Sequence, residues 1–119
     1  MKVVIIGTGY VGLVSGVGFA EIGHNVICVD IDQKKIETIN KCKSQIYEEG
    51  LDDLLRSNVT KGRLTATTNL KEAIIDADIT MIAVGTPYNN GIIDLTYIKK
   101  AASDIADVLE FAPNYHVVC

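Results

Sequence analysis

The fold of this chain is decided by two stretches of sequence, KVVIIGTGYVG at residues 2–12 and NVICVD at residues 25–30. The first is an apolar run that leads into the spacing G-x-G-x-x-G, and the second is an apolar run that ends in an acid. Between them, apolar and small residues recur at helical spacing over residues 10–22. A strand, a glycine turn, a helix and a second strand are therefore predicted, which is the pattern of a dinucleotide-binding unit.

Each glycine of the turn has a separate role if a dinucleotide binds there. Gly7 lets the chain turn sharply out of the strand, Gly9 lets a pyrophosphate approach the backbone, and Gly12 lets the helix pack closely on the strand. The N-terminus of the helix adds free N–H groups and the positive end of the helix dipole. Glycine turns also occur without a ligand, but the acid that follows this one favours a cofactor site.

Asp30 lies 18 residues after Gly12, close to the spacing of a carboxylate that binds the ribose of adenosine. Its charge would repel a 2′-phosphate, which favours NAD over NADP. Lys34 and Lys35 leave this preference open. Lysines in the first turn of the next helix can form a solvated face, or they can help to hold the cofactor.

The composition indicates one folded domain. The chain has 119 residues, of which 48% are hydrophobic and 22% charged, so it can bury a sizeable core. A net charge of −4 leaves no basic face for nucleic acid. Apolar runs such as residues 79–84 are too short to span a bilayer, and a strand at the N-terminus is not the pattern of a signal peptide. We expect neither a nucleic acid nor a membrane as partner.

The cysteines favour a reducing compartment. Cys28, Cys42 and Cys119 are odd in number and show no C-x-x-C spacing, which argues against a disulfide framework or a zinc site. We therefore expect a cytoplasmic protein without a metal. Cys28 lies inside an apolar run and is interpreted as a small buried hydrophobe, and the isolated His24 and His116 are interpreted as structural.

The rest of the chain continues the alternation of helices and strands. Asp32 and Asn69 are predicted helix N-caps. The expected elements after residue 30 are a helix through Ile36 and Ile39, a helix from Leu51, a strand at 63–68, a helix at 70–77, a strand at 79–84, a polar loop at 88–93, a helix from Asp94 or Thr96, and a strand at 115–119. This order predicts an α/β fold with a doubly wound parallel sheet of strand order 3-2-1-4-5.

Several local patterns agree with one known family. They are GTGYVGL at residues 7–13, GH at 23–24, VDID at 29–32, IYEEGL at 46–51 and AVGTP at 83–87. In order and without large gaps, these patterns resemble the NAD-binding, Rossmann-like N-terminal domain of the UDP-glucose/GDP-mannose dehydrogenases. The resemblance covers essentially all of residues 1–119. One departure is Glu49, where the family usually has proline, so this connection is expected to be less rigid.

The resemblance implies NAD as the cofactor and assigns roles to individual residues. Tyr10 and Val11 contribute backbone amides to the pyrophosphate, and Asp30 binds the adenosine ribose with Lys35 beside it. Thr86 contacts the cofactor where the strand at 79–84 ends. The predicted cofactor-binding residues are Gly7, Gly9, Tyr10, Val11, Gly12, Asp30, Lys35 and Thr86.

The resemblance also implies a reaction, the oxidation of a sugar C6 alcohol to a carboxylate with two NAD. In the family a cysteine thiolate captures the aldehyde, and the thioester formed after the second oxidation is hydrolysed. That cysteine and the residues that assist it lie in family segments beyond residue 119, and no cysteine of this chain matches it. We therefore expect no catalytic residue here. The chain is expected to be the cofactor half of a longer, homodimeric enzyme, without the central helix and sugar-nucleotide domain, and inactive alone.

Two alternatives to the favoured function remain open. UDP-glucose is the favoured substrate, but a sibling enzyme acting on GDP-mannose or on a UDP-N-acetyl-hexosamine would share this half of the chain. A regulatory domain that senses dinucleotides would share the glycine turn and the acid, but not the AVGTP and IYEEGL segments.

A strand at 115–119 would leave an exposed sheet edge, which invites self-association.

Overall fold

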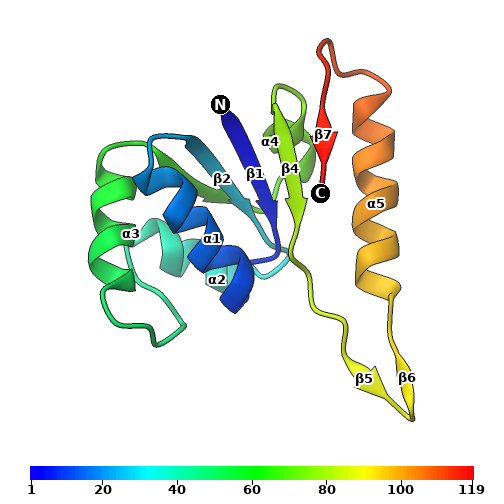
Figure 1. The fold of residues 1–119 in the computed structure, drawn as a ribbon, viewed down its shortest axis with the longest axis horizontal. Coiled ribbons are helices and arrows are strands. Elements are labelled where there is room, and N and C mark those ends of the chain that lie inside the picture. The colour runs from blue at the N-terminus through cyan, green and yellow to red at the C-terminus, as the bar shows by residue number, and fades with distance from the viewer.

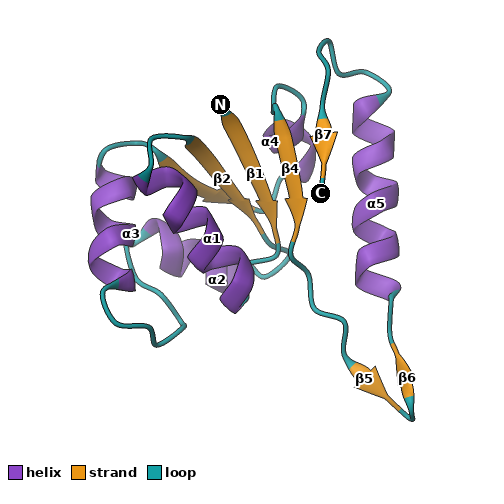
Figure 2. Cartoon of the chain, in the orientation of Figure 1, coloured by secondary structure: helices purple, strands orange, loops and turns teal.

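The computed structural model describes all residues, 1–119, as a parallel sheet with helices on both faces (Figures 1 and 2). The strands of this sheet are β1 (Lys2–Ile6), β2 (Asn25–Val29), β3 (Leu64–Thr67), β4 (Ile79–Ile82) and β7 (Val117–Val118). The helices are α1 (Tyr10–Glu21), α2 (Gln33–Asn40), α3 (Leu51–Thr60), α4 (Leu70–Ile74) and α5 (Thr96–Leu109). The sheet order is β3-β2-β1-β4-β7, which confirms the predicted order because β7 is its fifth strand along the chain.

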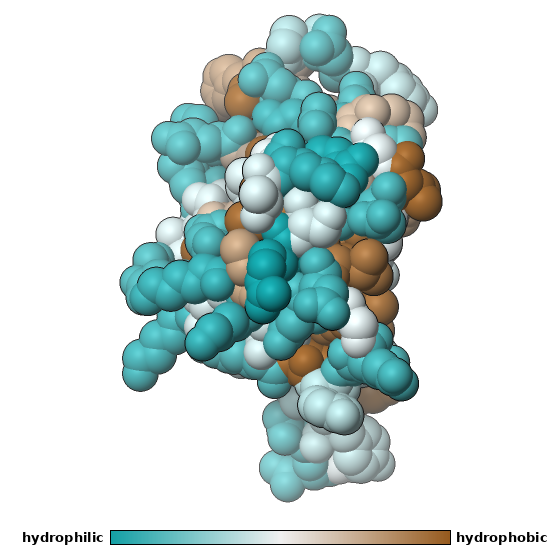
Figure 3. Space-filling view, turned by 90° about the vertical axis from the view of Figure 1, so that its left-hand side faces the viewer, coloured by the Kyte–Doolittle hydropathy of each residue, from teal (hydrophilic) through white to brown (hydrophobic).

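The sheet separates two apolar clusters. Val3 and Ile5 belong to the cluster under α1, α2 and α3, whereas Val4 and Ile6 belong to the cluster under α4 and α5. Helices on both faces explain why β1 is apolar at consecutive positions. The outer surface on the α3 side is largely hydrophilic, with hydrophobic side chains gathered along one edge (Figure 3).

The helix boundaries follow the predicted capping residues. The Asp32 carboxylate accepts hydrogen bonds from the backbone amides of Lys34 and Lys35, and the Asn69 side chain accepts one from the amide of Glu72. At the end of α1, Gly23 has φ +104°. The amides of Gly23 and the next residue donate to carbonyls of the last turn, which closes the helix as a Schellman motif.

One segment is more ordered than the sequence indicated. The stretch at 88–93 was expected to be a polar, turn-forming loop around residues 89–91, and it forms a hairpin of β5 (Tyr88–Asn89) and β6 (Ile92–Ile93). Asn90 and Gly91 both have positive φ, as a two-residue turn that matches strand twist requires. Helix α5 begins at Thr96, and the preceding Asp94 carboxylate accepts a hydrogen bond from the Thr96 amide.

The hairpin projects from the main body beyond the carboxyl ends of the strands (Figure 1). Strand β7 lies at an edge of the sheet, paired only with β4. None of the helices combines the length and the apolar character that crossing a membrane demands.

Candidate functional site

The glycine turn between β1 and α1 is held by close backbone packing. Gly7 has φ +97°, and a Cβ there would lie 2.6 Å from the carbonyl oxygen of Ala83. A Cβ on Gly12 would lie 1.9 Å from the carbonyl oxygen of Gly7. No real Cβ tolerates these distances, so the path of the turn depends on glycine at both positions.

Gly9 differs from its two neighbours in the motif because a Cβ there would meet nothing within 4 Å. It is the N-cap of α1, and no side chain caps the helix. The first helical hydrogen bond runs from the Leu13 amide to the Gly9 carbonyl, at 2.9 Å. The amides of Tyr10 and Val11, two exposed residues, precede that bond and have no partner within the helix, so they can bind an anion. Open space over a helix N-terminus fits a pyrophosphate.

Asp30 stands at the end of β2, directly beside the turn. Its Oδ2 accepts hydrogen bonds from the Thr8 amide at 2.8 Å and from the Thr8 hydroxyl at 2.6 Å. Its Oδ1 accepts one from the Asp32 amide at 3.0 Å. The Lys35 ammonium lies 3.8 Å from Oδ2, and only 10% of the Asp30 side chain is exposed. The acid, the turn and the first turn of α2 therefore form one connected site.

The charge of Asp30 is stabilised by this arrangement. Burial by itself raises the pKa of the carboxyl, but the hydrogen bonds from Thr8 and Asp32 and the charge of Lys35 together outweigh it. The pKa of Asp30 consequently lies below its usual value. At neutral pH the group is a carboxylate that can accept a hydrogen bond from a ribose hydroxyl.

Thr86 lies at the same edge of the sheet but apart from this network. Thr86 is exposed and lies a few residues after β4. The chain that leaves β4 runs beside the glycine turn, because the Ala83 amide donates to the Ile6 carbonyl at 2.8 Å. No hydrogen bond joins the Thr86 side chain to the other predicted residues. Lys35, in contrast, lies beside Asp30, as the family resemblance implied.

Two residues of the site were missed by the sequence analysis. Thr8 is 5% exposed and holds Asp30, and Glu48 accepts a hydrogen bond from the Tyr10 hydroxyl. That hydrogen bond and the negative charge of Glu48 raise the pKa of Tyr10. A hydroxyl residue between two turn glycines was the available signal for Thr8. The pairing with Glu48 joins segments 38 residues apart and had no local signal.

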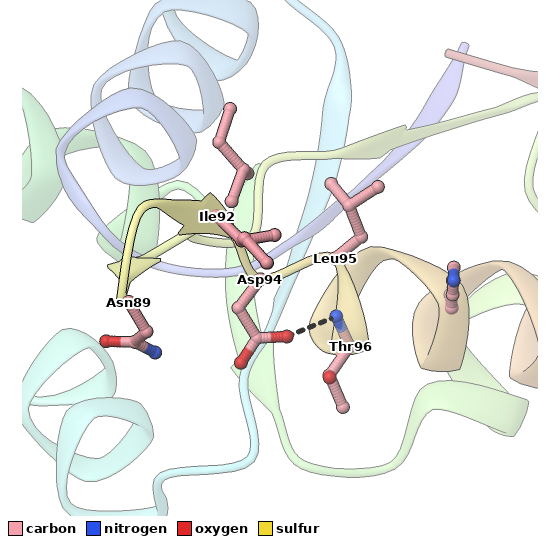
Figure 4. Close-up of a pocket in the computed structure, with 7 residues that line it drawn as sticks. Asn89, Ile92, Asp94, Leu95 and Thr96 are labelled. Atoms are coloured by element: carbon pink, nitrogen blue, oxygen red, sulfur yellow. Dashed lines mark hydrogen bonds between the residues drawn. The ribbon is translucent and has the colours of Figure 1, made fainter.

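An open hollow lies elsewhere in the molecule. It has a volume of about 510 Å³ and is formed by the hairpin and the start of α5. Figure 4 shows Asn89, Ile92, Asp94, Leu95 and Thr96 around it, with the Asp94 carboxylate turned to the Thr96 amide. This hollow contains none of the predicted cofactor residues, and its charged groups are already partly used within the chain. The glycine turn is therefore the better candidate site.

The fold and this site define a dinucleotide-binding domain of the Rossmann type. The family model described as "UDP-glucose/GDP-mannose dehydrogenase family, NAD binding domain" matches residues 1–119 of the chain. The chain therefore belongs to this family. The cofactor of such a domain is NAD, and the free amides at α1 and the ionised Asp30 fit it.

Relatives and solved structures agree with this assignment. The chain is 51% identical over 112 residues to the UDP-glucose 6-dehydrogenase of Rhizobium meliloti, covering 92% of this chain and 26% of the relative. It is 52% identical over 109 residues to the UDP-glucose 6-dehydrogenase TuaD of Bacillus subtilis, which covers 91% of this chain and 24% of the relative. A crystal structure of GDP-mannose dehydrogenase from Pseudomonas aeruginosa superposes with a TM-score of 0.96 at 41% identity. The superposition covers 99% of this chain and 27% of the solved one. The chain thus spans about a quarter of the length of these relatives.

Proposed function

We propose that this chain holds NAD for a dehydrogenase that oxidises UDP-glucose to UDP-glucuronate. The choice of sugar nucleotide rests on identity, which is 49–52% to three relatives named as UDP-glucose 6-dehydrogenases. Relatives named as GDP-mannose 6-dehydrogenases are 41–42% identical. GDP-mannose is the second candidate substrate, supported by the close superposition on the Pseudomonas aeruginosa structure.

The proposal rests on two features that lie in one site, an ionised Asp30 and unpaired amides at the N-terminus of α1. In this proposal the amides of Tyr10 and Val11 bind the pyrophosphate, and Gly9 leaves room for it. Asp30 accepts a hydrogen bond from the adenosine ribose, and Lys35 lies beside that carboxylate. Thr86 contacts the cofactor farther along the strand edge. When bound, NAD supplies the acceptor for the hydride that leaves the sugar.

The chain contributes binding and orientation rather than the nucleophile. Cys28 is fully buried, and burial raises the pKa of its thiol to about 12, so it stays protonated at neutral pH. Cys42 and Cys119 lie outside the glycine-turn site. We therefore propose that the 119 residues alone do not produce NADH from UDP-glucose, and that the oxidation needs residues found in the remaining length of the relatives.

The proposal is tested by calorimetric titration of NAD, NADP and UDP-glucose into the chain and into Asp30→Ala. Asp76→Ala is the matched control, because Asp76 is an exposed aspartate with no hydrogen-bond or ion-pair partner. We expect NAD to bind, Asp30→Ala to weaken it about tenfold or more, and Asp76→Ala to leave it unchanged, since hydrogen bonds to charged groups contribute about 1.5–3 kcal/mol. Little binding of NADP or of the sugar nucleotide is expected. Absence of NAD binding by the parent chain would overturn the proposal, and equal affinities for NAD and NADP would remove the role of Asp30.

A further inference from the structure

Asp30 does not present both of its oxygens to a ligand in the same way. Each carboxylate oxygen has two lone-pair sites. Oδ2 fills both of them, with the Thr8 amide and the Thr8 hydroxyl, and has the Lys35 ammonium at 3.8 Å. Oδ1 fills one, with the Asp32 amide. Oδ1 therefore keeps an accepting site for a ribose hydroxyl.

We propose that Thr8 is a positioning residue that clamps Oδ2 of Asp30 and so directs Oδ1 to the adenosine ribose of NAD. This inference rests on the proposed function, because it needs Asp30 to be the ribose acceptor. Thr8 itself does not touch the cofactor through its hydroxyl. It acts through Asp30 alone.

The backbone around the two residues makes this clamp rigid. Strands β1 and β2 are paired in parallel, with Ile6 opposite Val29, so the residues that follow them emerge side by side. The Gly7 amide donates to the Val29 carbonyl at 2.7 Å, and the Asp30 amide donates to the Thr67 carbonyl at 3.3 Å. Thr8 is 5% exposed, so water competes poorly for its hydroxyl. The clamp is thus anchored on both sides.

Thr8 also affects the charge of Asp30 more than the nearby charged side chains do. The hydrogen bond from the Thr8 hydroxyl leads the effects that lower the pKa of Asp30 against its burial, ahead of the amides and of Lys35. Lys35 is the charged group that faces Asp30, and its side chain is 37% exposed at 3.8 Å, which weakens it by screening. The Asp32 carboxylate is used in capping α2. Loss of the Thr8 hydroxyl should therefore leave the carboxylate held by the Thr8 and Asp32 amides alone, which loosens its position, and should raise its pKa.

The test compares Thr8→Val and Thr8→Ala, which lack the hydroxyl, with Thr8→Ser, which keeps it. Thr80→Val is the matched control, because Thr80 is a fully buried threonine whose hydroxyl pairs with His116 at 2.8 Å, in β4 and outside the site. Two quantities are measured in each chain. They are the Kd of NAD at neutral pH, by calorimetry, and the titration of the Asp30 carboxyl in the free chain, by carbon-13 NMR.

We expect Thr8→Val and Thr8→Ala to weaken NAD binding about tenfold, the scale of one lost hydrogen bond to a charged group. Both should move the Asp30 titration to higher pH. Thr8→Ser should bind NAD within about twofold of the parent and keep the low titration, since it retains the hydroxyl donor. Thr80→Val should change neither quantity. Thr8→Ala carries the test if Thr8→Val does not fold.

The positioning role is overturned if chains without the Thr8 hydroxyl bind NAD as the parent does. It is also overturned if Thr8→Ser binds as weakly as Thr8→Val, or if Thr80→Val weakens binding equally. These results differ from a failure of the proposed function. That failure appears in the parent chain, as absence of NAD binding, or in Asp30→Ala, as undiminished binding.

Discussion

Two regions at the carboxyl edge of the sheet differ in how they are built (Figure 1). Around the β1–α1 turn, Thr8 is 5% exposed, Asp30 accepts three hydrogen bonds, and a Cβ on Gly9 would meet nothing within 4 Å. Around the hairpin, Ile92 is 72% exposed beside a hollow of about 510 Å³. At the hollow, the Asp94 carboxylate already accepts a hydrogen bond from the Thr96 amide. A cofactor site is thus defined by fixed donors and charge rather than by volume.

The largest effect on stability is expected from Gly12→Ala, which should disrupt the β1–α1 turn. The new methyl would lie 1.9 Å from the Gly7 carbonyl oxygen, which is backbone and cannot move aside cheaply. We expect the free energy of unfolding to fall by about 3 kcal/mol or more, measured by urea titration. Gly9→Ala is the matched control, since its methyl meets nothing within 4 Å. It should stay within about 1 kcal/mol of the parent but lose NAD affinity.

A Gly12→Ala chain as stable as the parent would contradict the packing described for the turn. A Gly9→Ala chain that binds NAD normally would contradict the approach of the pyrophosphate to this residue. Together the two variants separate the role of the turn in folding from its role in binding.

Acid pH should weaken the site next most strongly. The pKa of Asp30 is lowered in the folded chain, so its contribution to stability is fully present above the unfolded value of about 3.9 and is lost as pH falls through the folded value. We expect Asp30→Asn to be less stable than the parent at pH 7, with the difference shrinking towards pH 3. Urea titrations at pH 7, 5 and 3 measure it, with Asp76→Asn as control. A difference that stays constant with pH would contradict the ionised site.

The smallest effect is expected at the hairpin. Ile92→Thr should change the free energy of unfolding by less than about 0.5 kcal/mol and leave NAD binding unchanged, because the side chain is 72% exposed. Ile74→Thr, at a fully buried isoleucine of α4, is the matched substitution and should cost about 2 kcal/mol or more. Equal losses at the two positions, in urea titrations, would mean that the hairpin is part of the core.

Much of the fold could be predicted from the sequence because its signals are local. Apolar runs gave the strands, Asp32 and Asn69 gave two helix starts, and the alternation of elements gave the sheet order. The hairpin was missed because its strands are only two residues each, too short for a periodic signal. The turn itself was predicted, because residues 89–91 carry an Asn-Gly pair.

The candidate site was predictable only in part, for a physical reason. The glycines and Asp30 could be found because their spacing along one βαβ unit is fixed by its geometry. The clamp between Thr8 and Asp30 and the contact between Tyr10 and Glu48 depend on side chains that meet across the fold. Such contacts are created by strand register and by the path of a connection, and no spacing rule encodes them.

NAD is expected to lie along the β1–α1–β2 edge and not at the hairpin hollow. This placement is tested most directly by following backbone amide chemical shifts of the chain while NAD is added. The largest changes are expected at residues 8–12, at Asp30 to Lys35 and at Thr86. Changes centred on residues 89–99, which include the hollow, would contradict binding of NAD at the β1–α1 turn.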